Sequence, residues 1–178
     1  MIKKFFKHLH TVNKHRWEVF KLCVKVGIPY RGLVHDLSKY SYEEFSESVK
    51  YYTDGHISPL RTCRDKTGIS RAWLHHKGRN KHHIEYWYDY ASPDKALVMP
   101  KKYAFEMICD RIAAGKIYNK KNFNYSCPLD YFYKEEKYMI INPKIRSFME
   151  EVFIKLKDEG EKVLNKKTLN EIYDKYVK

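Results

Sequence analysis

The chain has 178 residues, of which 43% are hydrophobic, so it can bury one sizeable core, and its length favours a single domain. No apolar run approaches the roughly 20 residues that cross a bilayer, which excludes a membrane-spanning helix. The formal net charge of +13 at pH 7 suits a small phosphorylated substrate, because clustered Lys and Arg concentrate anions; a nucleic-acid partner is not favoured, since a lysine-rich composition alone gives such a charge.

The cysteines and the N-terminal segment indicate the cellular compartment. The four cysteines form no CxxC pair, and the segment MIKKFFKHLHTVNKHRW lacks the uninterrupted apolar core of a signal peptide. We therefore expect reduced thiols in a cytoplasmic protein.

Apolar residues recur at helical spacing through most of the chain, and glycines, prolines and polar clusters punctuate the pattern. Ser41 and Glu44 have the spacing of a capping box, and Pro100 is well placed at the first position of a helix. In chain order, the predicted elements are a helix over 5–26, a short element over 33–39, a helix over 41–52, a helix from Ser70 that Gly78 interrupts before it continues over 80–90, and helices over 100–115, 143–160 and 167–177. The remaining stretches, 53–68, 92–100 and 117–128, are predicted to be loops or connectors. The predicted fold class is all-α.

An adjacent histidine and aspartate, His35 and Asp36, end an apolar run in GLVHDLSKYS. Neutral imidazole and carboxylate are both ordinary ligands of Zn, Fe or Mn, and a carboxylate can bridge two ions. A dipeptide of this kind also arises by chance, as a capping Asp beside a His at the edge of the core. The pair alone leaves both interpretations open.

Two further ligand-type side chains interrupt apolar helical patterns. His15 lies 20 residues before His35, on a helix whose next positions face inward. Asp110 stands within FEMICDRIAA, where an unpaired carboxylate is costly to bury and therefore needs a cation or a donor. A metal ion meets that need, and so does Arg111 or a nearby Lys.

Four of the nine histidines lie within nine positions, in the stretch WLHHKGRNKHHIEYW. This stretch can be a metal site, a nucleic-acid contact or a solvated basic turn. On a continuous helix, histidines seven positions apart share a face but lie about 10.5 Å apart, so the chain must bend at Gly78 for two of them to reach one ion. We predict that one histidine of each pair, His75 or His76 and His82 or His83, turns inward.

The ordered set of these residues resembles the HD superfamily of metal-dependent phosphohydrolases. The signature of that superfamily is a His on one helix, a His-Asp pair with a Lys three positions after the Asp, and a later Asp. The matching residues here are His15, His35, Asp36, Lys39 and Asp110. Members with two metal ions add two further His in the interval that HHKGRNKHH occupies here. The runs GLVHDLSKYSYEEF and WLHHKGRNKHHIEYW also look like an uncharacterised bacterial family of the superfamily, one of unknown function.

The resemblance implies a single HD-like helical domain over 1–178, with a metal-site core at about 8–115 and a helical extension at about 128–178. Two features depart from the superfamily pattern. Ser38 stands where a glycine commonly precedes the signature Lys, and the two His pairs are only seven residues apart. In the better-known two-metal members, the extra histidines come from elements farther apart in sequence.

For the site, the resemblance implies one or two divalent transition-metal ions, drawn from Fe, Mn, Zn, Co and Ni. The first ion would be held by His15, His35, Asp36 and Asp110. Asp36 would bridge to a second ion, which one member of each His pair completes. Metal coordination lowers the pKa of water toward neutrality, so a hydroxide is the implied nucleophile, and the ions would also neutralise phosphate charge.

The resemblance also implies how phosphate is bound. Lys39 would contact the phosphate of a nucleotide or related ester, and together with Asp36 it would form the catalytic pair. Lys77, Arg79 and Lys81 rim the histidine stretch and would bind further phosphate oxygens, since Arg in particular suits bidentate contact. The alternative for these three residues is a solvated basic turn.

The leading expectation is therefore a metal-dependent phosphohydrolase. A first rival is a di-iron oxygenase, because some HD-fold proteins with a two-metal His set oxidise their substrates instead. A second rival is a non-enzymatic basic nucleic-acid-binding protein, whose histidines hold a structural metal or none. A steep salt dependence of nucleic-acid binding would identify the second rival.

Overall fold

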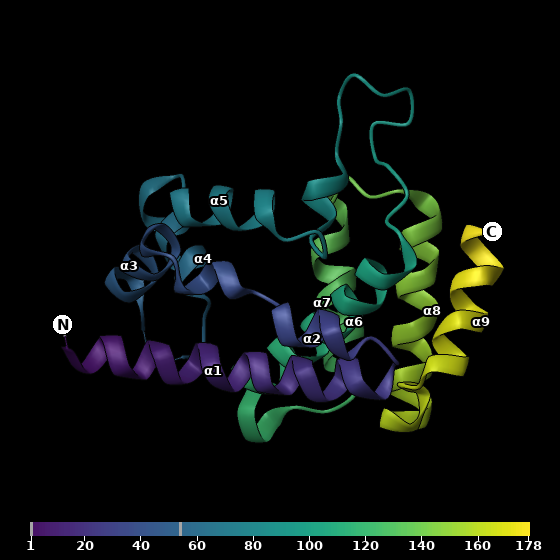
Figure 1. The fold of residues 1–178 in the computed structure, drawn as a ribbon, viewed down its shortest axis with the longest axis horizontal. Helices are drawn as coiled ribbons and strands as arrows, with labels where there is room; N and C mark the ends of the chain where they lie inside the picture. Colours follow the sequence, from purple (N-terminus) through teal and green to yellow (C-terminus); the bar gives the residue numbers. More distant parts are fainter. Residues whose placement is uncertain (1, 54) are drawn as a thin grey trace.

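The computed structural model describes residues 2–53 and 55–178, which form nine α-helices and five short 3-10 helices (Figure 1). Within these residues the only β-type pairing is a single bridge between Tyr88 and Ala96. The all-α prediction is confirmed. None of the helices in the described part of the chain combines the length and the apolar character that crossing a bilayer requires.

In chain order, the α-helices are α1 (Ile2–Lys25), α2 (Pro29–Val34), α3 (Tyr42–Tyr51), α4 (Pro59–Thr67), α5 (Arg71–Arg79), α6 (Lys101–Asn119), α7 (Cys127–Glu135), α8 (Pro143–Glu159) and α9 (Lys166–Val177). The 3-10 helices are η1 (Leu37–Tyr40), η2 (Ile84–Trp87), η3 (Lys120–Asn122), η4 (Glu136–Tyr138) and η5 (Gly160–Val163).

Several helix predictions are confirmed, and their caps explain why. The Ser41 side chain accepts a hydrogen bond from the Glu44 N–H at the start of α3, and Ser70 accepts one from the Trp73 N–H at the start of α5. Helices α1, α8 and α9 also lie where apolar periodicity predicts them. Helix α6 begins one residue later than predicted, with Pro100 at the N-cap, and continues beyond its predicted end to Asn119.

Other predictions are wrong. The predicted loop over 53–68 contains α4, in which only Pro59 and Cys63 are buried, so its apolar pattern is too weak to reveal a helix. Helix α7 likewise begins inside the predicted connector over 117–128. Helix α5 runs through Gly78 without interruption and ends at Arg79. The continuation predicted beyond it is a turn, the short helix η2 and a loop that projects from the body of the molecule (Figure 1).

Helix α6 is the central element of the fold. It is buried on nearly all sides and packs against α1, α2 and α7, as expected for a helix that is apolar around most of its circumference. The core is continuous from α1 to α9, through residues such as Val19, Ile108, Phe148 and Leu169. Helices α3, α4 and α5 form a separate layer over the N-terminal half of α1 (Figure 1).

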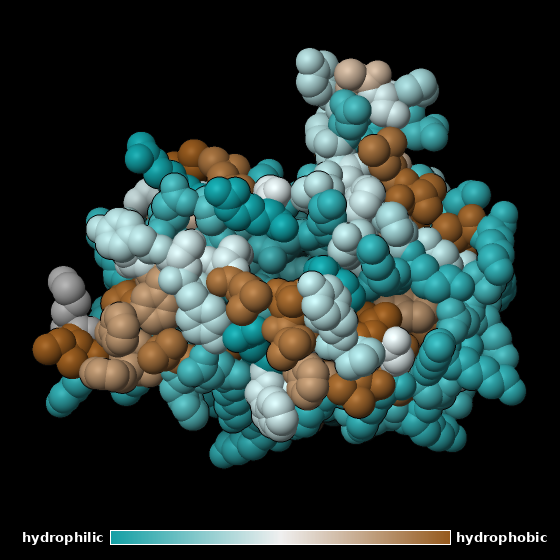
Figure 2. All heavy atoms as spheres, viewed as in Figure 1, coloured by the Kyte–Doolittle hydropathy of each residue, from teal (hydrophilic) through white to brown (hydrophobic). Residues whose placement is uncertain are grey.

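Helix α2 lies unusually close to α1, and one glycine permits this approach. A Cβ atom at Gly32 would lie 2.7 Å from Cβ of Cys23 and 2.9 Å from Cα of Phe20, closer than real Cβ contacts allow. The opposite side of α2 is exposed at Tyr30 and Leu33. Figure 2 shows hydrophobic side chains on the surface of this face of the molecule. The close packing at Gly32 fixes where the chain leaves α2 and enters the His35–Asp36 turn.

Candidate metal centre

The predicted element over 33–39 is two elements, α2 and η1, separated by a left-handed turn at Asp36. The backbone of Asp36 has φ 53° and ψ 28°, a conformation that Asp tolerates better than most residues. Arg16 of α1 donates hydrogen bonds to the carbonyl oxygens of His35 (2.7 Å) and Leu33 (2.8 Å). The turn is therefore held on α1, and His35 and Asp36 are both fully buried.

Two groups of ligand-type side chains meet at this turn and share Asp36. The first group is His15, His35, Asp36 and Asp110. The second group is Asp36, His76, His82 and His83. Within each group, one donor atom from every residue lies within 4.8 Å of the others. Two donor atoms on opposite sides of a common ion lie about 4.2 Å apart, twice the ~2.1 Å bond. The donor atoms of each group lie near this spacing, so either group could hold a metal ion.

The two carboxylate oxygens of Asp36 face different groups. Oδ2 lies 3.2 Å from Nε2 of His35 and 3.9 Å from Nε2 of His15, both in the first group. Oδ1 lies 3.4 Å from Nε2 of His76 and 3.4 Å from Nε2 of His82, both in the second. Asp110 completes the first group, with its Oδ1 2.9 Å from Nε2 of His15. Asp36 thus stands as a bridging carboxylate would.

Several buried polar atoms in these groups form no hydrogen bond to any described residue. They are Nε2 of His15, His35, His82 and His83, Nδ1 of His82, and both oxygens of Asp36. Two of these atoms still have charged neighbours, since Asp110 lies 2.9 Å from Nε2 of His15 and Lys39 lies 2.7 Å from Oδ2 of Asp36. Lys39 thus supplies a cation to Oδ2, whereas Oδ1 faces Nε2 of His76 and of His82 at 3.4 Å. Buried polar atoms normally have partners, so imidazole nitrogens and carboxylate oxygens that face one another suit a metal ion in each group.

Two glutamates position the ring nitrogens on the far side of these histidines. Glu106 Oε1 lies 3.0 Å from Nδ1 of His35 and 3.2 Å from Nδ1 of His82, so it contacts one histidine of each group. Burial raises the pKa of Glu106, but hydrogen bonds with these two histidines outweigh it and lower the pKa to about 2. Glu44 Oε2 lies 2.7 Å from Nδ1 of His76. Carboxylates in this position fix the tautomer that leaves Nε2 free for a metal.

These two glutamates are not among the predicted site residues. The sequence pattern indicates Glu44 only as a capping residue, and it does not single out Glu106, which is buried one helical turn before Asp110. That spacing, two carboxylates on one face of an apolar helix, is the signal that could have identified it.

The predicted phosphate-binding cations lie at different distances from the centre. Lys39 Nζ lies 2.7 Å from Oδ2 of Asp36. Burial raises the pKa of Asp36, but the charges of His35 and Lys39 outweigh it and hold that pKa well below its ordinary value. Arg79 instead donates to Nε2 of His75 at 2.8 Å, and Lys77 is a half-buried residue of α5. Lys39 is the cation that contacts the shared carboxylate.

The two histidine pairs differ in how many members reach Asp36. In the first pair, His76 belongs to the second group, whereas Nδ1 of His75 lies 2.7 Å from Glu44 and belongs to neither group. In the second pair both His82 and His83 belong to the second group, rather than one as expected. The prediction that one histidine of each pair turns inward rests on a helix that bends at Gly78.

The chain instead turns at Asn80. Its Nδ2 donates to the His76 carbonyl (2.8 Å) and to Oγ of Ser38 (2.8 Å). Ser38, the residue that departs from the HD pattern, therefore helps to hold the turn that brings His82 and His83 inward. Burial lowers the pKa of His83 well below its ordinary value, so its ring is neutral, as a ligand must be.

The fold and the donor groups define an all-α protein with a buried His/Asp/Glu set that can bind a metal ion. The chain belongs to a family of unknown function, DUF5662, whose sequence profile matches residues 4–155. Both donor groups lie within the matched residues. No curated protein and no solved structure matches the chain.

Proposed function

We propose that this protein is a metal-dependent phosphohydrolase of the HD type, acting on a nucleotide or a related phosphate ester. The observation that carries the proposal is the position of Asp36. Its two oxygens face two separate donor groups, and Lys39 lies against the same carboxylate. A shared carboxylate with an adjacent cation is what hydrolysis of a phosphate ester at a two-metal site requires.

The protein would hold two divalent transition-metal ions, one in each donor group. Bound there, the ions would supply an activated water and neutralise charge on the phosphate. The mixed histidine and carboxylate ligands suit Fe, Mn, Zn, Co or Ni. Asp36 would keep the two positions together, while Glu106 and Glu44 would orient the histidine rings that complete them.

Lys39 would bind a phosphate oxygen directly. Burial would lower the pKa of Lys39, but the negative charges of Asp36 and Asp110 outweigh it and raise that pKa, so the ammonium keeps its charge. A fixed positive charge beside the reacting phosphate stabilises the charge that develops during its transfer. This cation supports hydrolysis over oxidation, since oxidation of a neutral substrate has no need of it.

The proposal is tested on freshly purified protein by elemental analysis and by phosphate release from a panel of nucleotides and simpler esters. The expected result is up to two transition-metal ions per chain and phosphate release that a chelator abolishes. Protein prepared with iron under anaerobic conditions provides the second arm. Substrate-dependent oxygen consumption without phosphate release would replace the hydrolase with an oxygenase. A protein that takes up no transition metal from any preparation would contradict both.

A further inference from the structure

A small pocket opens beside the first donor group and runs along α1. At one end it is lined by His15 and Lys39, and at the other by His8, with Ser58 and Leu60 across from α1. His8 lies seven residues before His15 on the same face of α1, about 10.5 Å along the helix axis. We call this space the His8 pocket. A ligand whose phosphate lies at Lys39 would extend its remaining atoms into it.

Hydroxyl groups dominate the polar lining of the His8 pocket. Five side chains that border it carry one, namely Thr11, Ser48, Tyr52, Ser58 and Tyr118. The carboxylate there, Glu44, is already bonded to His75 and His76. Val12 and Leu60 supply apolar wall. Away from the Lys39 end, the pocket therefore offers neutral donors and acceptors, which suits a ligand group that carries hydroxyls and no charge.

His8 is the lining residue whose buried polar atom has no partner, in the described part of the chain, that accounts for it. Its side chain is buried, with 6% exposure, and Nδ1 has no hydrogen-bond partner among the described residues. The ring is held by aromatic neighbours, Phe45 at 5.1 Å and Tyr52 at 5.6 Å between centroids. Burial and the charge of Lys39 lower the pKa of His8 to about 4, so the ring is neutral. A buried, unpaired, neutral imidazole nitrogen in a pocket indicates a polar ligand.

The size of the pocket limits that ligand. Its volume is about 50 Å³, whereas pockets that enclose a whole drug-sized ligand measure roughly 300–1,000 Å³. By this measure one water molecule needs about 10–15 Å³, so the space holds a group of a few non-hydrogen atoms and is small for a purine ring. The base of a nucleotide would remain outside.

We infer that the His8 pocket binds a hydroxyl-bearing organic group of the substrate, with His8 as the specificity-determining residue, so the substrate class is a small polyol or sugar phosphate. This inference rests on the proposed phosphohydrolase function and narrows it. The phosphate would lie at Lys39 and the two donor groups, and a hydroxyl at the far end of the organic group would bond to Nδ1 of His8.

The test compares glycerol phosphate with propyl phosphate, which lacks the hydroxyls but is otherwise similar in size. Wild-type protein loaded with metal should prefer glycerol phosphate in kcat/KM by at least about tenfold, because a site built for a hydroxyl discriminates against its absence. His8→Ala should reduce this ratio toward one, and His8→Asn, which restores a polar atom near the Nδ1 position, should recover part of it. The exposed neighbour His10→Ala is the matched control and should keep the full ratio.

A ratio near one in the wild type, or a high ratio that His8→Ala leaves intact, would overturn the inference. Thr11→Val provides a nearly isosteric second variant, should His8→Ala fold poorly, and it should also lower the ratio. If the metal-loaded protein releases phosphate from nucleotides but from neither ester, the inference fails and the proposed function stands. If it hydrolyses no phosphate ester at all, the proposed function fails, and calorimetric binding of the two esters then tests the pocket separately. Tighter binding of glycerol phosphate that depends on His8 would support the pocket, and equal binding would refute it.

Discussion

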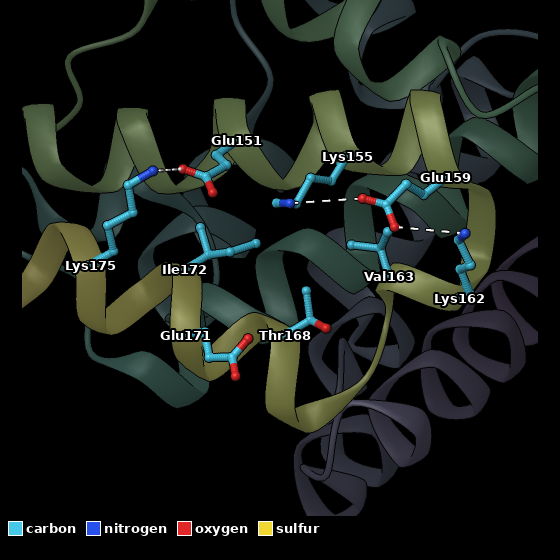
Figure 3. A pocket seen from close by; sticks show the side chains of 9 residues that line it. All are labelled: Glu151, Lys155, Glu159, Lys162, Val163, Thr168, Glu171, Ile172 and Lys175. Atoms are coloured by element: carbon cyan, nitrogen blue, oxygen red, sulfur yellow. Dashed lines mark hydrogen bonds and ion pairs between the residues drawn. The ribbon is translucent and has the colours of Figure 1, made fainter.

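Charged side chains gather in two regions of this molecule, with opposite character. Between α8 and α9 a groove of about 500 Å³ is lined largely by lysines and glutamates that pair with one another (Figure 3). Lys175 lies 2.6 Å from Glu151, and Lys155 lies 3.8 Å from Glu159; Lys155, Glu159 and Lys175 are exposed, and Glu151 is partly exposed. At the candidate metal centre the donor atoms are buried, and several form no hydrogen bond among the described residues.

The two regions differ in whether their charged and polar groups already have partners, and this indicates where a ligand is expected in a strongly basic protein. Exposed pairs satisfy each other or are hydrated, so they need no ligand and contribute little to stability. Buried donors without partners are costly unless something binds them, because water cannot reach them. The groove has the larger volume, but buried polar atoms without hydrogen-bond partners in the described chain lie at the candidate metal centre. Variants in both regions test this contrast.

The largest effect is expected from Asp36→Asn. Asparagine tolerates the left-handed backbone at this position as aspartate does, so the turn should persist. Loss of the shared charge should release at least one metal ion and reduce phosphate release by more than the roughly 10–100-fold typical of groups that only position a ligand. Elemental analysis, a phosphate assay and circular dichroism measure the three quantities. Full metal content with unchanged activity would disprove the bridging role.

A neighbouring pair of variants separates donors from supporting residues. His76→Ala should lose metal from the second group and with it activity, because His76 Nε2 lies 3.4 Å from Oδ1 of Asp36. His75→Ala should retain metal, since His75 contacts Glu44 and belongs to neither donor group. Both variants remove one imidazole from the same helix, so thermal stability serves as the common control. Equal metal loss in the two would contradict the assignment.

Lys39→Met should weaken phosphate release while metal content is largely retained. Methionine keeps an apolar stem and removes the charge, and a charge-assisted hydrogen bond contributes about 1.5–3 kcal/mol, which corresponds to roughly 10- to 150-fold. Arg79→Ala should have a smaller effect, because Arg79 contacts His75 rather than Asp36. If Lys39→Met loses its metal as well, the lysine holds the donor groups together rather than the phosphate.

Glu106→Gln tests whether a positioning residue couples the two donor groups. Glu106 contacts Nδ1 of both His35 and His82, and replacing such a partner typically weakens metal affinity by about 10–100-fold. Competition with a chelator should show this weakening for both metal positions together. Glu85→Gln, at an exposed position, is the matched control. A change confined to one metal position would mean that Glu106 supports only one histidine.

Some residues of the candidate metal centre can be predicted from the sequence and others cannot, and the difference has a physical reason. His15 and Asp110 can be selected because each interrupts an apolar helical pattern, and that pattern is local. The role of Glu106 depends on His35, 71 residues away in sequence, and on a hydrogen bond that only the folded chain creates. The inward turn of His83 likewise depends on the contact between Asn80 and Ser38, which are 42 residues apart. Residues that act through distant partners carry no local pattern.

The helices of the fold also differ in how well the sequence predicts them. Helices α1 and α8 are predicted because many of their apolar residues face one core. Helix α4 escapes prediction because the side that it buries is narrow, with two buried residues in a segment rich in charge. Periodicity reports how much apolar surface a helix buries, so it identifies the helices of the core more reliably than a peripheral helix.

The smallest effect is expected in the groove between α8 and α9. Lys155 and Glu159 are one turn apart on α8, and their side chains are 40% and 44% exposed. An exposed pair of this spacing contributes about 0.3–0.5 kcal/mol, so Lys155→Ala should barely move the denaturation midpoint and should leave metal content and phosphate release unchanged. Because Glu159 also lies 3.8 Å from Lys162, its carboxylate keeps a partner in the variant. Loss of activity in Lys155→Ala would mean that the groove contributes to function, and the distinction between paired and unpaired charge would then fail as a guide to this molecule.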